Sequence, residues 1–198
     1  MINSANNQYT DYLRYKYWVL IAVGLFAIGI VAGLIIGFSR PAGIMALFSE
    51  ELSALTELGA MFSPFKVTTA IFIFFKNAST LLISFIFSPI LCLLPIMALL
   101  LNGSLLSFIS VIVSHQESLA LLFAGLLPHG ILEIPALIIG EAAALSFGAT
   151  TIITLLSKKE RKPLPVQLKQ NLKYLLLAFV LLVPAAIIET FITPLFLQ

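Results

Sequence analysis

The length of its apolar runs constrains this chain more than any other feature of the sequence. The runs cover residues 17–38, 67–113, 119–156 and 172–192. A helix needs about 20 apolar residues to cross a hydrocarbon core of about 30 Å. The chain has 198 residues, of which 60% are hydrophobic and 10% charged, whereas soluble domains average about 25% charged residues. We therefore expect an all-α, polytopic helical membrane protein, with residues 1–198 forming one domain in a lipid bilayer.

The run from 119 to 156 is too long for one straight crossing. Glycine and proline interrupt it repeatedly, which favours one full span together with a broken or re-entrant half-span. In the run from 67 to 113, Pro89 and Pro95 indicate a turn around Ser88–Pro95. The sequence therefore predicts about five full transmembrane helices, near residues 17–38, 67–87, 94–114, 119–156 (broken) and 172–192.

The charges predict the orientation of these spans. Eight of the eleven Lys and Arg residues lie in the N-terminal tail and in the 157–173 region, and basic loops stay in the cytoplasm. We expect a multi-pass protein of the cell membrane, with a cytoplasmic N-terminus, a cytoplasmic basic loop at 157–171 and an external C-terminus. Segment 41–65 has the periodicity of an amphipathic helix and is predicted to lie externally, along the membrane surface or against the bundle.

Three carboxylates lie inside the apolar runs. Glu133, Glu141 and Glu189 are all flanked by apolar residues, and His129 lies four residues before Glu133. Ionisable groups at membrane depth are costly and usually face a protein interior or a watery cavity. Residues four apart share one face of a helix. These four residues are the core of a candidate intramembrane polar site.

Two asparagines and a lysine add to this candidate site. Asn77 and Lys76 interrupt one span, and Asn102 is followed by glycine and serine inside the next. Small residues and amides favour close helix contact and hydrogen bonds between helices, so a packing role for Asn102 is favoured over a ligand role. Lys76 lies deep enough that it either extends toward the interface or pairs with a buried glutamate.

Several chemistries are open to His129 and Glu133. They fix a kinked helix at Pro135, or they handle protons or ions, or they bind a metal with Glu141 and Glu189 completing the set. The sequence has no His-Glu-x-x-His motif and no cysteine cluster, so an intramembrane metal-dependent hydrolase is the weakest alternative. We expect no enzyme activity, no cofactor, no metal and no nucleic-acid partner.

Several motifs resemble the stage II sporulation protein M family of integral membrane proteins. The block from Pro128 to Pro135 is the most specific, and the C-terminal segment from Glu189 to Pro194 is the second. The residues that carry the resemblance are Pro128, His129, Gly130, Glu133, Pro135, Gly148, Glu189, Thr193 and Pro194, together with Asn77 and Asn102. In endospore formers, members of the family work in a membrane complex with cell-wall hydrolases. The resemblance therefore implies a membrane scaffold, or an assembly component of an envelope complex, with envelope proteins as partners.

The alternative is a small ion or solute channel or transporter, formed by a homodimer, that uses His129, Glu133 and Glu189. Broken helices with buried carboxylates recur at transporter midplanes, although the sequence has no clear inverted repeat. Acids that line a wet cavity would favour transport, and paired acids in a dry bundle would favour the scaffold.

Overall fold

The computed structural model describes residues 2–39, 64–90, 92–116, 118–156 and 164–196; among these, the side chains of residues 2–14, 116, 121, 129 and 164 lie outside the description. These ranges are helical and contain no strand, which confirms the all-α class. The predicted amphipathic segment 41–65 lies almost wholly outside the described residues. The helices are α1 (Ile2–Ser39), α3 (Val67–Phe87), α4 (Leu93–Gln116), α5 (Leu119–Leu156) and α6 (Leu164–Ile187), which continues through a π-helix, η1 (Ile188–Ile192), into α7 (Thr193–Phe196).

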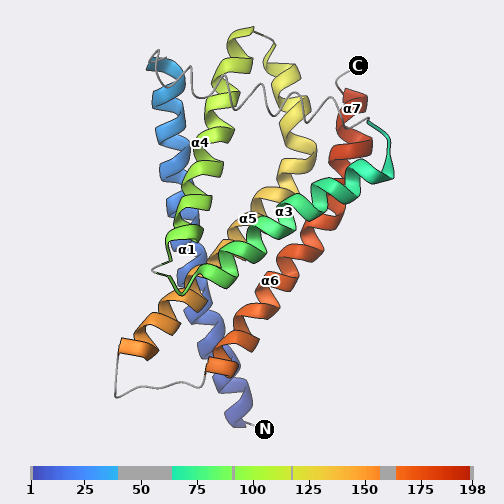
Figure 1. The fold of residues 1–198 in the computed structure, drawn as a ribbon. Helices are drawn as coiled ribbons and strands as arrows, with labels where there is room; N and C mark the ends of the chain where they lie inside the picture. The colour runs from blue at the N-terminus through green and yellow to red at the C-terminus, as the bar shows by residue number, and fades with distance from the viewer. Residues whose placement is uncertain (1, 40–63, 91, 117, 157–163, 197–198) are drawn as a thin grey trace.

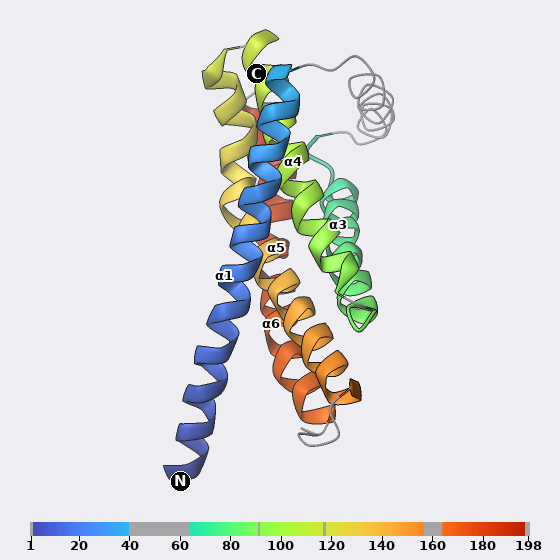
Figure 2. The ribbon, with the colours of Figure 1, turned by 90° about the vertical axis from the view of Figure 1, so that its left-hand side faces the viewer.

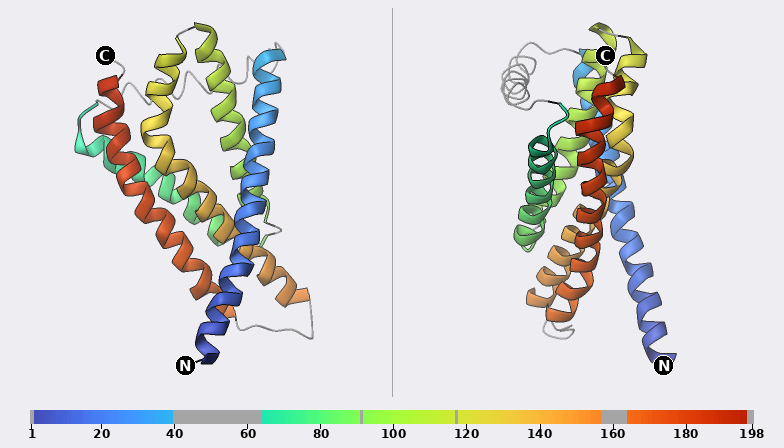
Figure 3. Two further views of the ribbon diagram at one scale, coloured as in Figure 1. Left: turned by 180° about the vertical axis from the view of Figure 1, so that it is seen from behind. Right: turned by 90° about the vertical axis from the view of Figure 1, so that its right-hand side faces the viewer.

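Five helical stretches are long and apolar enough to cross a membrane: Tyr15–Ser39, Val67–Phe87, Leu93–His115, Gly130–Leu156 and Pro165–Phe196. Their number agrees with the prediction of about five spans. The helices alternate in direction, so the start of α1, the end of α5 and the start of α6 lie at one end of the bundle (Figure 1). The α4–α5 connection and the end of α7 lie at the other end, and the side views agree (Figures 2 and 3).

Helices α1 and α4 run in parallel and approach each other most closely where both carry glycine. A Cβ atom on Gly33 would collide with the backbone oxygen of Ser104, and one on Gly103 would collide with the backbone oxygen of Phe26. The Ser104 hydroxyl donates a hydrogen bond to the Gly29 carbonyl at 3.0 Å. Without a hydrophobic driving force in lipid, such small-residue contacts hold helices together. The packing role expected for the segment beginning at Asn102 is therefore confirmed at Gly103 and Ser104.

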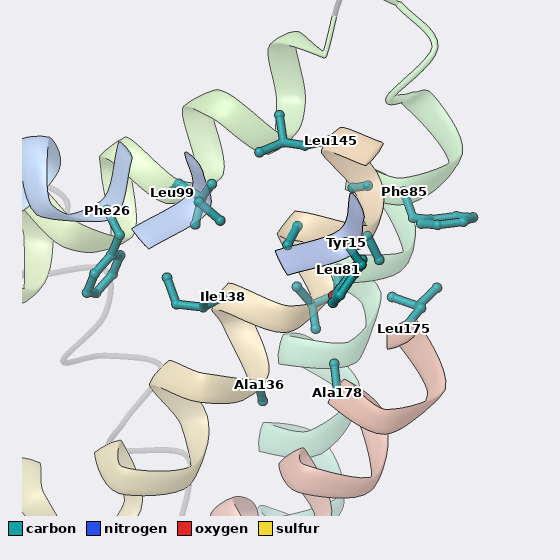
Figure 4. Packing of buried hydrophobic residues seen from close by; sticks show 14 of the residues in the cluster. Tyr15, Phe26, Leu81, Phe85, Leu99, Ala136, Ile138, Leu145, Leu175 and Ala178 are labelled. Atoms are coloured by element: carbon teal, nitrogen blue, oxygen red, sulfur yellow. The ribbon is translucent and has the colours of Figure 1, made fainter. Parts of the chain in front are cut away.

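Helix α5 is the centre of the bundle. Its span is mostly buried, whereas no more than about a third of each of the other four spans is buried. Buried side chains from α1, α3, α4 and α6 converge on it, including Phe26, Leu81, Leu99 and Leu175 (Figure 4). Exposed apolar surface on the outer helices is what a bilayer covers, and soluble monomers rarely expose large apolar patches.

Three sequence boundaries need correction. The run from 119 to 156 is neither broken nor re-entrant, because α5 is helical throughout and accommodates Pro128 and Pro135 by bending (Figure 1). A proline in a helix removes one hydrogen bond and kinks the helix without ending it, where neighbours support both sides. The predicted basic loop at 157–171 is shorter, since α6 begins at Leu164. The predicted turn at 88–95 is also shorter, because α4 begins at Leu93 and includes Pro95. Proline is tolerated there, since the N–H groups of the first helical turn have no partner within the helix.

Candidate functional site

A cluster of polar side chains, exposed at Lys76 and half-buried at Asn77, Glu133 and Glu189, joins α3, α5 and η1. We call Lys76, Asn77, Glu133 and Glu189 the polar cluster. The Asn77 side-chain amide donates a hydrogen bond to Glu133 Oε1 at 2.9 Å, linking α3 to α5. Glu189 lies close enough to Glu133 and Lys76 to interact electrostatically with both. The structure therefore brings together two of the three carboxylates that the sequence singled out, with Lys76 within electrostatic reach of Glu189. Because Lys76 is exposed, both alternatives for it, extension toward the interface and pairing with a glutamate, stay predictions.

The π-helix that carries Glu189 follows from the sequence after it. Pro194 has no N–H, so the carbonyl of Thr190, four residues earlier, loses its helical donor. The backbone N–H of Phe65 supplies a hydrogen bond to that carbonyl at 3.2 Å, and the Thr193 hydroxyl bonds to the Ile188 carbonyl at 3.3 Å. A wide π-turn is often found at functional sites. Thr193 and Pro194 thus shape the turn on which Glu189 stands.

Glu141 lies apart from the polar cluster. It is two helical turns further along α5 than Glu133, and its Oε2 accepts a hydrogen bond from the Ser84 hydroxyl of α3. The side chain has no solvent exposure, and within the described residues its Oε1 has no hydrogen-bond partner. The residues that follow it, Ala142 to Ala144, are fully buried as well. Glu141 is therefore sealed in packed apolar surroundings and does not complete a set with Glu133 and Glu189.

The remaining motif residues of α5 divide into two kinds. A Cβ atom on Gly148 would collide with the carbonyl oxygen of Ser88, so glycine is required there for α5 to pass the α3–α4 turn. A Cβ atom on Gly130 would meet only Ile134 Cδ1, at 3.8 Å, an ordinary contact. The His129 side chain lies outside the described residues, so the predicted His129–Glu133 pair stays a prediction.

A cavity of about 370 Å³ lies between α1, α4 and the first half of α5. We call it the lateral cavity. Its walls are mostly apolar, and its polar lining residues, among those whose side chains are described, are Asn102, Ser110 and Glu133. Asn102 donates a hydrogen bond to the Ala98 carbonyl of its own helix at 2.7 Å. Glu133 therefore belongs to both features, because its Oε1 is bonded to Asn77 and the residue is among those that line this cavity. Among the described residues, no three His, Cys, Asp or Glu side chains are grouped to hold a metal ion.

Ser84 was not predicted as a site residue, although the spacing of polar residues along two of the spans pointed to it. Asn77 and Ser84 are seven residues apart on α3, while Glu133 and Glu141 are eight apart on α5. Both spacings are about two helical turns, so two helices packed in parallel align both pairs at once. The contact of Leu81 with Gly140 between the two pairs follows the same register.

Five apolar spans, with a polar cluster that links three of the helical elements, define a polytopic helical membrane protein. The family model for stage II sporulation protein M matches residues 21–194, and the chain belongs to this family. An uncharacterised protein of Methanocaldococcus jannaschii is 40% identical over 79 residues, which is 40% of this chain and 44% of that relative. The chain thus aligns with less than half of the relative's length. No solved structure matches.

Proposed function

We propose that the protein is a membrane-embedded assembly component of an envelope complex and that its polar cluster fastens the helices of the scaffold. The Asn77–Glu133 hydrogen bond supports this most directly, because it uses a carboxylate inside an apolar span for a contact between two helices. Glu141 supports it as well, since it is bonded to Ser84 within packed alanines instead of sharing a space with the cluster. In this reading the chain is not an enzyme, and its partners are envelope proteins.

A native-membrane crosslinking experiment tests this proposal. We expect the wild-type protein, tagged and expressed at its native level, to be crosslinked to one or a few envelope proteins. The same partners should co-purify in mild detergent with the Glu133→Gln variant, because the amide keeps an oxygen that accepts from Asn77. Recovery of the chain alone, or only with copies of itself, would count against the proposal.

A small channel or transporter is the second candidate, and the lateral cavity is the observation that favours it. The cavity brings open space to Glu133 at membrane depth, and carboxylates in such places mark ion and proton paths. A homodimer would be one way to build a full passage. Against it, the described cavity is lined by Glu133 but by neither Glu141 nor Glu189, so the acids do not form one continuous polar path there.

We also propose the orientation in which the start of α1 and the α5–α6 connection face the cytoplasm of a cell membrane. Basic residues concentrate at that end, and the opposite end carries the α4–α5 connection and α7. In a Cys92→Ser background, single cysteines at Glu51 and Gln198 should react with a membrane-impermeant maleimide added outside intact cells. Cysteines at Asn6 and Lys159 should react only after lysis, and labelling of Lys159→Cys with protection of Glu51→Cys would reverse the orientation.

A further inference from the structure

The lateral cavity opens onto the lipid-facing surface of the bundle. Phe123, Leu127 and Ile131 line it, and their side chains are 54%, 51% and 65% exposed. Most of the lining residues belong to the spans Leu93–His115 and Gly130–Leu156. At the rim, Phe123 and Leu127 precede the second span and Ile131 lies within it, so the rim belongs in part to the surface that a bilayer covers. A ligand therefore reaches the cavity sideways from the membrane.

The size and walls of the cavity fit an apolar chain better than water. Its volume of about 370 Å³ lies in the range of small-molecule sites, which are mostly apolar with a few placed polar groups. Filling it with water would take about twelve molecules at roughly 30 Å³ each, and each ordered water needs two to four polar partners. Among the residues whose side chains the structure describes, three polar ones line the cavity.

Those three side chains offer mainly acceptor oxygens. The single hydroxyl proton of Ser110 is donated to the Leu106 carbonyl at 2.6 Å, and Asn102 donates one of its two amide protons to Ala98. Glu133 Oε1 accepts from Asn77. A ligand with a hydroxyl donor complements such a site, whereas a phosphate or carboxylate headgroup, which itself presents acceptor oxygens, meets mainly lone pairs.

We infer that the lateral cavity binds a lipid-like molecule with a neutral hydroxyl headgroup, whose hydroxyl lies beside Asn102 and Glu133 and whose chain fills the apolar walls. This goes beyond the assembly function and does not depend on it, so either can fail alone.

Photo-crosslinking in proteoliposomes tests the inference. The probes are a long-chain alcohol bearing a diazirine in its chain and the carboxylic acid of the same chain. We expect the alcohol to attach to wild-type side chains of α4 and α5 that line the cavity, and to label at least about fivefold more than the acid. Equal or stronger labelling by the acid, or attachment spread evenly over the outer helices, would overturn the inference.

Two glycines provide a matched pair of variants. Gly130→Leu places a side chain into the cavity, where a Cβ atom meets nothing closer than Ile134 at 3.8 Å, and should reduce alcohol labelling about tenfold. Gly24→Leu on α1, where a Cβ atom has nothing within 4 Å, does not line the cavity and should label like the wild type. Undiminished labelling of a folded Gly130→Leu variant would overturn the inference.

Asn102→Leu is a second variant that tests the same inference if Gly130→Leu does not fold. It removes the amide from an exposed position of α4 and should lower alcohol labelling about fivefold to tenfold, with acid labelling unchanged. If no probe labels the cavity and Asn102→Cys instead crosslinks two copies of the chain, the cavity is an interface between copies and the inference is wrong.

Discussion

Gly33→Leu is expected to destabilise the protein by about 3 kcal/mol or more, the largest effect of any single substitution argued for this chain. A Cβ atom at this position would collide with the backbone oxygen of Ser104 and with the hydroxyl of Ser107. A helix backbone has no way to rotate aside as a flexible side chain does. Relief of the collision therefore requires α1 and α4 to separate, which also breaks the Ser104–Gly29 hydrogen bond.

Thermal unfolding in detergent, followed by circular dichroism, measures this effect. Gly24→Leu is the matched control, because it makes the same substitution on the same helix at a position where a Cβ atom has nothing within 4 Å. It should unfold close to the wild type. Equal midpoints for the Gly33 and Gly24 variants would show that α1 and α4 do not pack through their glycines.

Glu133→Leu is expected to have the second largest effect, a destabilisation of about 1–3 kcal/mol. The substitution leaves the Asn77 amide without its acceptor between α3 and α5. Glu133→Gln should be nearly silent, since its side-chain oxygen still accepts from Asn77.

A double-mutant cycle isolates this contact. Asn77→Leu combined with Glu133→Leu removes donor and acceptor together, and the double variant should lose less stability than the sum of the two single losses. Unfolding midpoints of the four proteins give the coupling directly. Strict additivity would mean that the Asn77–Glu133 hydrogen bond does not stabilise the bundle.

Much of the fold was predictable because a bilayer restricts the structures that a chain can adopt. A backbone in hydrocarbon must satisfy its own hydrogen bonds, so run length and charge bias were enough for the number of spans. The close contact at Gly103 was also predictable, since small residues inside an apolar run have few other uses. The bend of α5 was misread as a break, because Pro128 and Pro135 each remove a hydrogen bond only locally and the helix continues through both.

The candidate site was only half predictable, for a different reason. Glu133, Glu141 and Glu189 were recognisable as costly groups, but which of them meet depends on which helices are neighbours. The parallel packing of α3 against α5 sends Glu133 to Asn77 and Glu141 to Ser84. The position of Glu189 depends on the π-turn before Pro194. Residue type predicts that such groups need partners, and only the packing of helices decides the partners.

The central claim is that the polar cluster fastens a scaffold and does not conduct. Flux of protons and small ions into proteoliposomes, measured over a range of pH with wild type and Glu133→Gln in parallel, tests it most directly. The titratable carboxyl is lost in the variant while its shape is kept. The scaffold account predicts that neither protein raises flux above that of empty liposomes. A pH-dependent flux through the wild type that Glu133→Gln abolishes, with the variant still folded, would contradict the account.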